Sequence, residues 1–173
     1  MSTSSYTSFN PVVVALFSIF LMCGIYIGYN EDVIPNVTAG LGFFIWGALP
    51  HFGCLIASYR IGKTNAAVVL MIFTGFWTLL SISLLAGLKK ELGPLFLYSE
   101  PVIAISVFVM SYYYFKDKER PLGGILIGLG LTVSILWVSK ALKWSPHVGS
   151  ITVGILGFFV LLTAINQLNR KQA

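Results

Sequence analysis

Six long apolar runs divide the chain, and each is long enough to cross a lipid bilayer as a helix. The runs cover residues 11–29, 37–58, 65–88, 95–115, 121–139 and 148–166. A membrane-spanning helix needs about 20 apolar residues, and the charges and turn-forming residues collect between the runs. The pattern predicts an all-α membrane protein, a single domain over residues 1–173 folded as a six-transmembrane-helix bundle.

The composition excludes the main alternatives to a membrane protein. The chain is 57% apolar and 10% charged, with a mean hydropathy of +0.86. A water-soluble fold needs charged residues to cover its surface, and a disordered chain combines low hydrophobicity with high charge. Cys23 and Cys54 lie within apolar runs, so packing explains them better than a disulfide or a metal site does.

The basic residues predict the orientation in the membrane. An even number of spans places both termini on one side, and that side would carry seven Lys and Arg residues against four on the other. The positive-inside rule then makes both termini cytoplasmic. The net charge of +5 comes from these loops, so it gives no reason to expect a nucleic acid partner, and membrane lipids are the partners that the composition implies.

The fourth run carries a signal for a late helix start. In Ser99-Glu100-Pro101 the proline suits the first turn of a helix, and the serine and glutamate can accept from its free N–H groups. We therefore expect the helix to begin at Pro101, with residues 95–98 as a loop on the outer side. Glu100 would then be the only acid near a span.

Small residues spaced by four recur in four of the spans. Such pairs let two helix backbones approach closely, although glycine is also simply common in membrane helices. We favour close packing for the set: Gly24 and Gly28, Gly53 and Ala57, Gly124 and Gly128, Ser150 and Gly154.

The spans hold few groups that could catalyse a reaction. They contain no pair of acids, no His–Glu–His cluster and no Gly-x-Ser-x-Gly motif, and no Lys or Arg away from their ends. We therefore expect no enzyme activity, no cofactor and no metal. So few charges suit a path for a small solute that is weakly polar or singly charged.

One polar feature lies inside the second run, at Pro50-His51. Proline cannot donate to the carbonyl of Trp46 one turn earlier, so a kink with a freed acceptor is expected. His51 is the only imidazole inside a span. Two interpretations stay open for it: a protonatable group on a solute path, or a neutral histidine bonded to a neighbouring helix.

Other donors stand at a helix start and along the spans. Asn10-Pro11 opens the first run with a capping residue and a first-turn proline, and a helix start offers N–H groups to an anion. Thr74 and Thr132 carry hydroxyls inside spans. The usual role of such a hydroxyl is a bond to a carbonyl one turn back, and a few of them along a path would bind a carboxylate.

Four segments together carry a resemblance to a known family. They are Ser8 to Pro11, Gly42 to Gly53, the loop Tyr59-Arg60-Ile61-Gly62-Lys63-Thr64, and Phe73-Thr74-Gly75-Phe76-Trp77, in which Trp77 follows Thr64 by thirteen residues. Their order and spacing resemble the acetate uptake transporter family, whose bacterial members include the succinate–acetate permeases. The specific motifs lie within residues 10–77, while the span count and loop lengths agree over nearly the whole chain.

The resemblance implies a permease of the cell inner (plasma) membrane. It implies six-helix protomers assembled as a homo-hexamer, each with its own pore, passing acetate and related small carboxylates, succinate among them, with uptake often described as proton-linked symport. It also implies a narrow apolar constriction. Phe73 matches its aromatic member, Ile19 or Phe20 a second member, and Leu131 a third.

These residues suggest how a small organic acid would cross. The methyl group of acetate tolerates an apolar neck, whereas hydrated ions do not. Donors on either side, at Asn10 and Pro11, Thr74, Thr132 and His51, would receive the carboxylate. Two rival classes remain: a passive channel for small neutral solutes such as urea or ammonia, and a membrane scaffold without a pore.

Overall fold

The structure is a computed structural model that describes residues 10–169, and over that range it is all-helical. Six helices are long and apolar enough to cross a membrane, which confirms the predicted number of spans. One of them, the second, is built from three consecutive elements. The elements are α1 (Pro11–Asn30), α2 (Asn36–Gly42), the π-helical η1 (Phe43–Ala48), α3 (Leu49–Arg60), α4 (Thr64–Leu85), α5 (Lys89–Lys116), α6 (Arg120–Ala141) and α7 (Pro146–Asn169).

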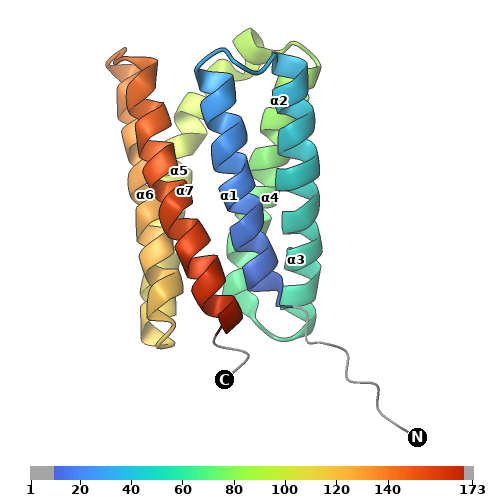
Figure 1. The fold of residues 1–173 in the computed structure, drawn as a ribbon, viewed down its shortest axis with the longest axis vertical. Coiled ribbons are helices and arrows are strands. Elements are labelled where there is room, and N and C mark those ends of the chain that lie inside the picture. The colour runs from blue at the N-terminus through green and yellow to red at the C-terminus, as the bar shows by residue number, and fades with distance from the viewer. Residues whose placement is uncertain (1–9, 170–173) are drawn as a thin grey trace, which may run out of the picture.

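The six spans form a closed ring. Each span packs against the next one in the chain, and α7 packs against α1 to close the circle. The helices run roughly along the long axis of the molecule (Figure 1). The end at which α1 begins and α7 ends is called the terminal end below, and the opposite end the distal end.

Tight turns make neighbours in the chain neighbours in the ring. Each of the five turns between spans has one residue in the left-handed region: Asp32, Gly62, Gly87, Lys118 and Lys143. At Gly62 the amide of Lys63 donates back to the carbonyl of Ser58 at 2.9 Å. This is the Schellman-type ending that glycine permits at low cost, and it reverses the chain within a few residues.

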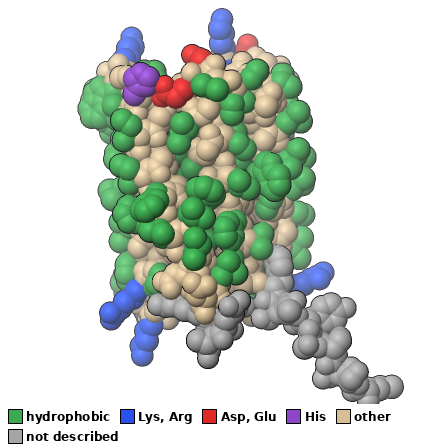
Figure 2. All heavy atoms as spheres, viewed as in Figure 1, with side chains coloured by type: hydrophobic (Ala, Val, Ile, Leu, Met, Phe, Trp, Pro, Cys, Tyr) green, Lys and Arg blue, Asp and Glu red, His purple; other side chains and the backbone are tan. Residues whose placement is uncertain are grey.

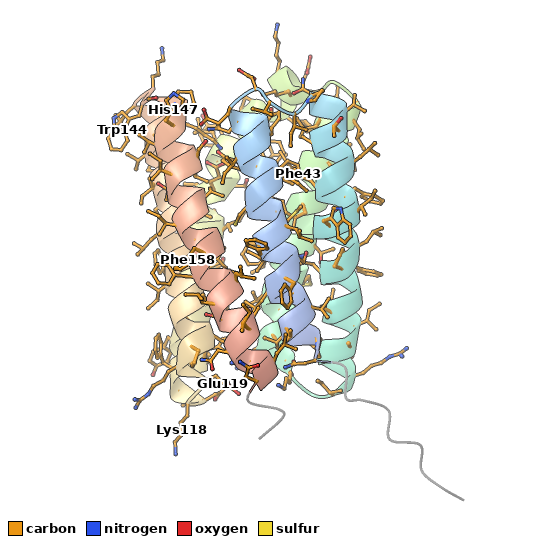
Figure 3. The ribbon with its side chains drawn as sticks, viewed as in Figure 1. Phe43, Lys118, Glu119, Trp144, His147 and Phe158 are labelled. Carbon is orange, nitrogen blue, oxygen red and sulfur yellow. The ribbon has the colours of Figure 1, made fainter. Side chains whose placement is uncertain are left out.

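The outer surface suits a lipid environment. Figure 2 shows hydrophobic side chains along the length of the visible face, with Lys and Arg at both ends and acidic residues and a histidine at the distal end. Phe158 of α7, labelled in Figure 3, is 58% exposed on this surface. In a bilayer such side chains face lipid, so the chain is a multi-pass membrane protein.

The second span has a π-helical stretch just before its proline. Pro50 follows η1 and has no N–H for the carbonyl of Trp46, and the hydroxyl of Ser18 on α1 donates to that carbonyl. The predicted freed acceptor is therefore confirmed. It serves as a contact between α1 and the second span.

The prediction that the fourth helix begins at Pro101 was wrong. α5 is continuous from Lys89 to Lys116 with Pro94 and Pro101 inside it. Each proline removes only one backbone bond, and the buried face of α5, which includes Phe96 and Glu100, packs into the ring. Residues 95–98 are therefore helical.

The distal end is closed between α1 and α7 by polar contacts. The side-chain amide nitrogen of Asn30, Nδ2, donates to the carbonyl of Pro146 at 2.8 Å and to the hydroxyl of Ser150 at 2.9 Å. His147, labelled in Figure 3, pairs through Nδ1 with Glu31 at 2.7 Å. These contacts fix the first and last spans side by side.

Candidate functional site

Two cavities lie in line inside the ring. The distal cavity has a volume of about 390 Å³ and is lined on α1 by residues from Ile19 to Asn30. The terminal cavity has a volume of about 60 Å³ and is lined on α1 by residues from Val12 to Ile19. On α6, residues from Leu129 to Lys140 line the distal cavity and residues from Leu122 to Leu129 line the terminal cavity. The cavities are therefore stacked along the axis of the bundle.

Ile19 and Leu129 line both cavities and separate them. We call these two residues the neck. Ile19 is 8% exposed and Leu129 is 6% exposed. Phe73, 3% exposed, belongs to the same buried cluster and lines the terminal cavity directly beside them. The path between the cavities is thus blocked by apolar side chains from α1, α4 and α6.

His51 lies on the wall of the terminal cavity and is fully buried. Its Nδ1 is 2.7 Å from the carbonyl oxygen of Gly47; because a carbonyl only accepts, Nδ1 carries the hydrogen and donates. Its Nε2 has no partner among residues 10–169. The imidazole is tilted against the ring of Phe73, with centroids 6.1 Å apart. Nδ1 therefore makes a structural hydrogen bond within the second span, whereas Nε2 makes none with the described residues.

The distal cavity contains an ion pair that joins two helices. Glu100 of α5 is 4% exposed, and its Oε1 pairs with the ammonium of Lys140 on α6. Its other oxygen, Oε2, has no partner among the described residues. Lys89 lines the same cavity and lies over the ring of Tyr29, 4.7 Å from its centroid. A buried carboxylate inside a span is costly unless paired, and such residues commonly mark solute sites.

An aromatic wall completes the distal cavity. Trp77 stacks on Phe43 with ring centroids 5.5 Å apart and meets Phe76 edge-on at 5.1 Å. Phe76 in turn meets Phe96 of α5 edge-on at 6.0 Å. The indole Nε1 of Trp77 is buried without a partner in the described part of the chain. This wall therefore presents apolar area to the cavity, and the buried indole N–H is not exposed to it.

The remaining predicted site residues are divided between the cavities and the helix surfaces. Thr132 lines the distal cavity. Asn10 caps α1, where its side chain accepts from the amide of Val12 at 3.2 Å, and Pro11 is buried in the first turn. Thr74 donates to the carbonyl of Leu70 at 2.7 Å. Asn10, Pro11 and Thr74 line neither cavity.

Two residues predicted for the constriction, Leu131 and Phe20, line neither cavity. Leu131 is 52% exposed on the outer surface of α6 and lines neither cavity, so the structure does not bring it to the neck. Two positions along an α-helix turn the side chain by about 200°, and Leu129 takes the inward place. On α1, Ile19 rather than Phe20 lines the cavities; Phe20 is partly buried and packs against the buried core near Gly157 of α7.

Several residues that line the distal cavity were not predicted as site residues, among them Glu100, Lys140, Trp77 and Leu129. A signal for Glu100 existed, since Phe96, Glu100, Ala104 and Val107 repeat at helical spacing on the buried face of α5. The interpretation of Pro101 as a helix start hid that repeat. Lys140, one residue before the end of α6, gave no such signal.

The arrangement suits binding and passage of a solute. Within residues 10–169 no group of three His, Cys, Asp or Glu side chains is placed to hold a metal ion. The distal cavity offers donors, a positive excess and apolar area, and the neck offers none of the polar groups that a hydrated ion requires.

Comparison of the chain with known protein families, with curated proteins and with solved structures gives no match.

Proposed function

We propose that this membrane protein is a transporter or channel for acetate and similar small monocarboxylates. The observation that carries the proposal is the pair of cavities stacked inside one ring of helices and meeting at the apolar neck of Ile19 and Leu129. A methyl group can pass such a neck, whereas a hydrated ion would lose hydration at a cost on the order of several kcal/mol. The resemblance to the acetate uptake transporter family supports the same substrate class.

The charges around the distal cavity favour a monoanion. Its charged residues are Lys89, Lys140 and Glu100, which leaves one positive charge in excess. A monocarboxylate balances that charge, and a dicarboxylate such as succinate overbalances it. We therefore place succinate below acetate as a substrate.

A passive channel for small neutral solutes such as urea or ammonia is the second candidate. Two observations favour it: the neck consists of Ile and Leu side chains, and Glu100 is among the residues that line the cavity that a solute would enter. A neutral molecule avoids both the dehydration of a charge and the repulsion by Glu100. We propose transport rather than catalysis in either case.

Uptake of radiolabelled acetate into proteoliposomes tests the proposal. We expect uptake above that of protein-free liposomes, a larger rate when the outside is more acidic, and inhibition by propionate. Uptake of urea with no uptake of acetate would support the second candidate. If neither acetate nor urea crosses, the result would contradict both candidates and favour a membrane scaffold without a pore.

The assembly and orientation follow from the same proposal. We propose a homo-hexamer in the cell inner membrane with both termini in the cytoplasm, so that the distal cavity opens to the outside. Labelling of an engineered cysteine in the turn at Lys143 by a membrane-impermeant reagent on intact cells tests the orientation. Native mass spectrometry of the purified protein tests the hexamer.

A further inference from the structure

The distal cavity is large for acetate. Its volume of about 390 Å³ falls within the range of roughly 300–1,000 Å³ found for sites that bind drug-sized ligands. Acetate is a methyl group on a carboxylate and would fill only a small part of that space. A site of this size fits a ligand with a substantial apolar body.

The walls of the cavity match such a body. Phe76, Trp77 and Phe96 form a connected aromatic surface through edge-on contacts at 5.1 and 6.0 Å. Aromatic side chains bury large apolar areas and pack well against a ring or chain placed between them. Leu80 and Ile103 add aliphatic surface to the same lining.

The polar groups define where a ligand's head would lie. Lys140 forms an ion pair with Glu100, a residue that is 4% exposed, and the ammonium of Lys89 lies over the ring of Tyr29. The three charged residues in the lining leave one positive charge unbalanced. One negative charge on the ligand would balance the charged residues of this lining and give the ammonium groups an acceptor.

We propose that the distal cavity binds a monocarboxylate with an apolar body larger than that of acetate, such as an aromatic or medium-chain acid. The carboxylate lies at Lys140, and the apolar body lies against the aromatic wall. The inference rests on the proposed function, because the larger acid would occupy the same path as acetate. It would be either a substrate of that path or a blocker of it.

Equilibrium dialysis of the full-length protein in nanodiscs tests this, with empty nanodiscs as the blank for partition into lipid. The probes are radiolabelled benzoate, hexanoate, acetate, benzyl alcohol and benzylammonium. We expect benzoate and hexanoate to bind at least tenfold more tightly than acetate, benzyl alcohol and benzylammonium. Acetate binding as tightly as benzoate would refute the size argument, and equal or tighter binding of benzyl alcohol or benzylammonium would refute the charge argument.

Variants locate the site. Lys140→Gln alone leaves Glu100 as a buried unpaired carboxylate, so the double variant Glu100→Gln/Lys140→Gln keeps the contact neutral and the fold intact. We expect this double variant, which removes the ammonium donor and leaves the net charge of the lining unchanged, to weaken benzoate binding at least tenfold. The matched control is Lys143→Gln, a lysine in the exposed turn after α6 that does not line the cavity, and it should bind as the wild type does. An unchanged affinity in the folded double variant would overturn the assignment.

Binding and transport separate the two proposals. Benzoate binding without acetate uptake in liposomes would contradict the proposed function and leave this site standing. Acetate uptake without any preference for benzoate over acetate in dialysis would contradict the inference and leave the function standing.

Discussion

The two ring nitrogens of His51 have different environments, and a pair of substitutions can separate them. Nδ1 donates to Gly47 while Nε2 has no partner among the described residues. The amide of asparagine reaches the position of Nδ1, and the amide of glutamine that of Nε2. We expect His51→Asn to keep the thermal stability of the wild type and to flatten the pH dependence of acetate uptake over the acidic pH range.

Thermal unfolding and uptake rates across that pH range check the prediction. His51→Gln should lose thermal stability, because it breaks the bond to Gly47. His147→Asn, at an exposed histidine of the distal end, is the control and should leave the pH profile unchanged. A wild-type pH profile in His51→Asn would show that the imidazole has only a structural role, through its packing and its bond to Gly47.

Phe73 is the aromatic residue beside the neck. It is buried in the same cluster as Ile19 and Leu129, so Phe73→Ala would enlarge the terminal cavity beside the neck. We expect faster acetate flux, or passage of larger acids, and a loss of stability of about 3–5 kcal/mol typical of a buried Phe→Ala change. Flux per folded protein in liposomes measures the first effect. Phe158→Ala, on the lipid-facing surface, should change neither, and equal flux in both variants would contradict the role of Phe73.

Among the elements, η1 depends on one glycine for its close packing. A methyl group at Gly47 would lie 2.5 Å from the sulfur of Met22 and 3.0 Å from Cγ of Trp77. A methyl group at Gly53, in α3, would meet nothing within 4 Å. We expect Gly47→Ala to cost about 1–3 kcal/mol through overpacking and to weaken binding in the distal cavity by displacing Trp77.

Gly53→Ala is the matched control. It should be neutral or slightly stabilising, because glycine inside a helix costs up to about 1 kcal/mol relative to alanine. Thermal unfolding of the two variants in detergent compares them directly. Equal melting temperatures would mean that η1 adjusts to the added methyl group.

The elements also show what could be predicted from the sequence. Six spans follow from hydropathy, because lipid demands long apolar helices. The start of α5 did not follow, because burial of the face around Phe96 and Glu100 outweighs the local preference of Pro101 for a first turn. Close packing predicted for Gly53 is absent within the described protomer, whereas Gly128 does lie near Leu156, at 3.5 Å from its would-be methyl group.

At the scale of the whole molecule, the ring could not be predicted from hydropathy. Hydropathy measures how each helix meets lipid, and it contains no information on which helix meets which. Short turns make sequential neighbours adjacent, but the closure of α7 on α1 depends on contacts such as that of Asn30 with Pro146. Hydropathy also gave no reason to prefer Leu129, which lines both cavities, to Leu131 on the same helix.

That difference between the two leucines provides a test of the axial path itself. Leu129 lines both cavities, whereas Leu131 is on the outer surface of the same helix. If the solute passes along the axis of the ring, Leu129→Ala widens the neck and raises acetate flux several-fold, at a stability cost of about 2–5 kcal/mol for a buried Leu→Ala change. Leu131→Ala removes the same side chain from the lipid-facing side and should leave flux unchanged. Flux through matched amounts of folded protein in liposomes decides the matter, because an increase in Leu131→Ala alone would move the path to an interface between protomers.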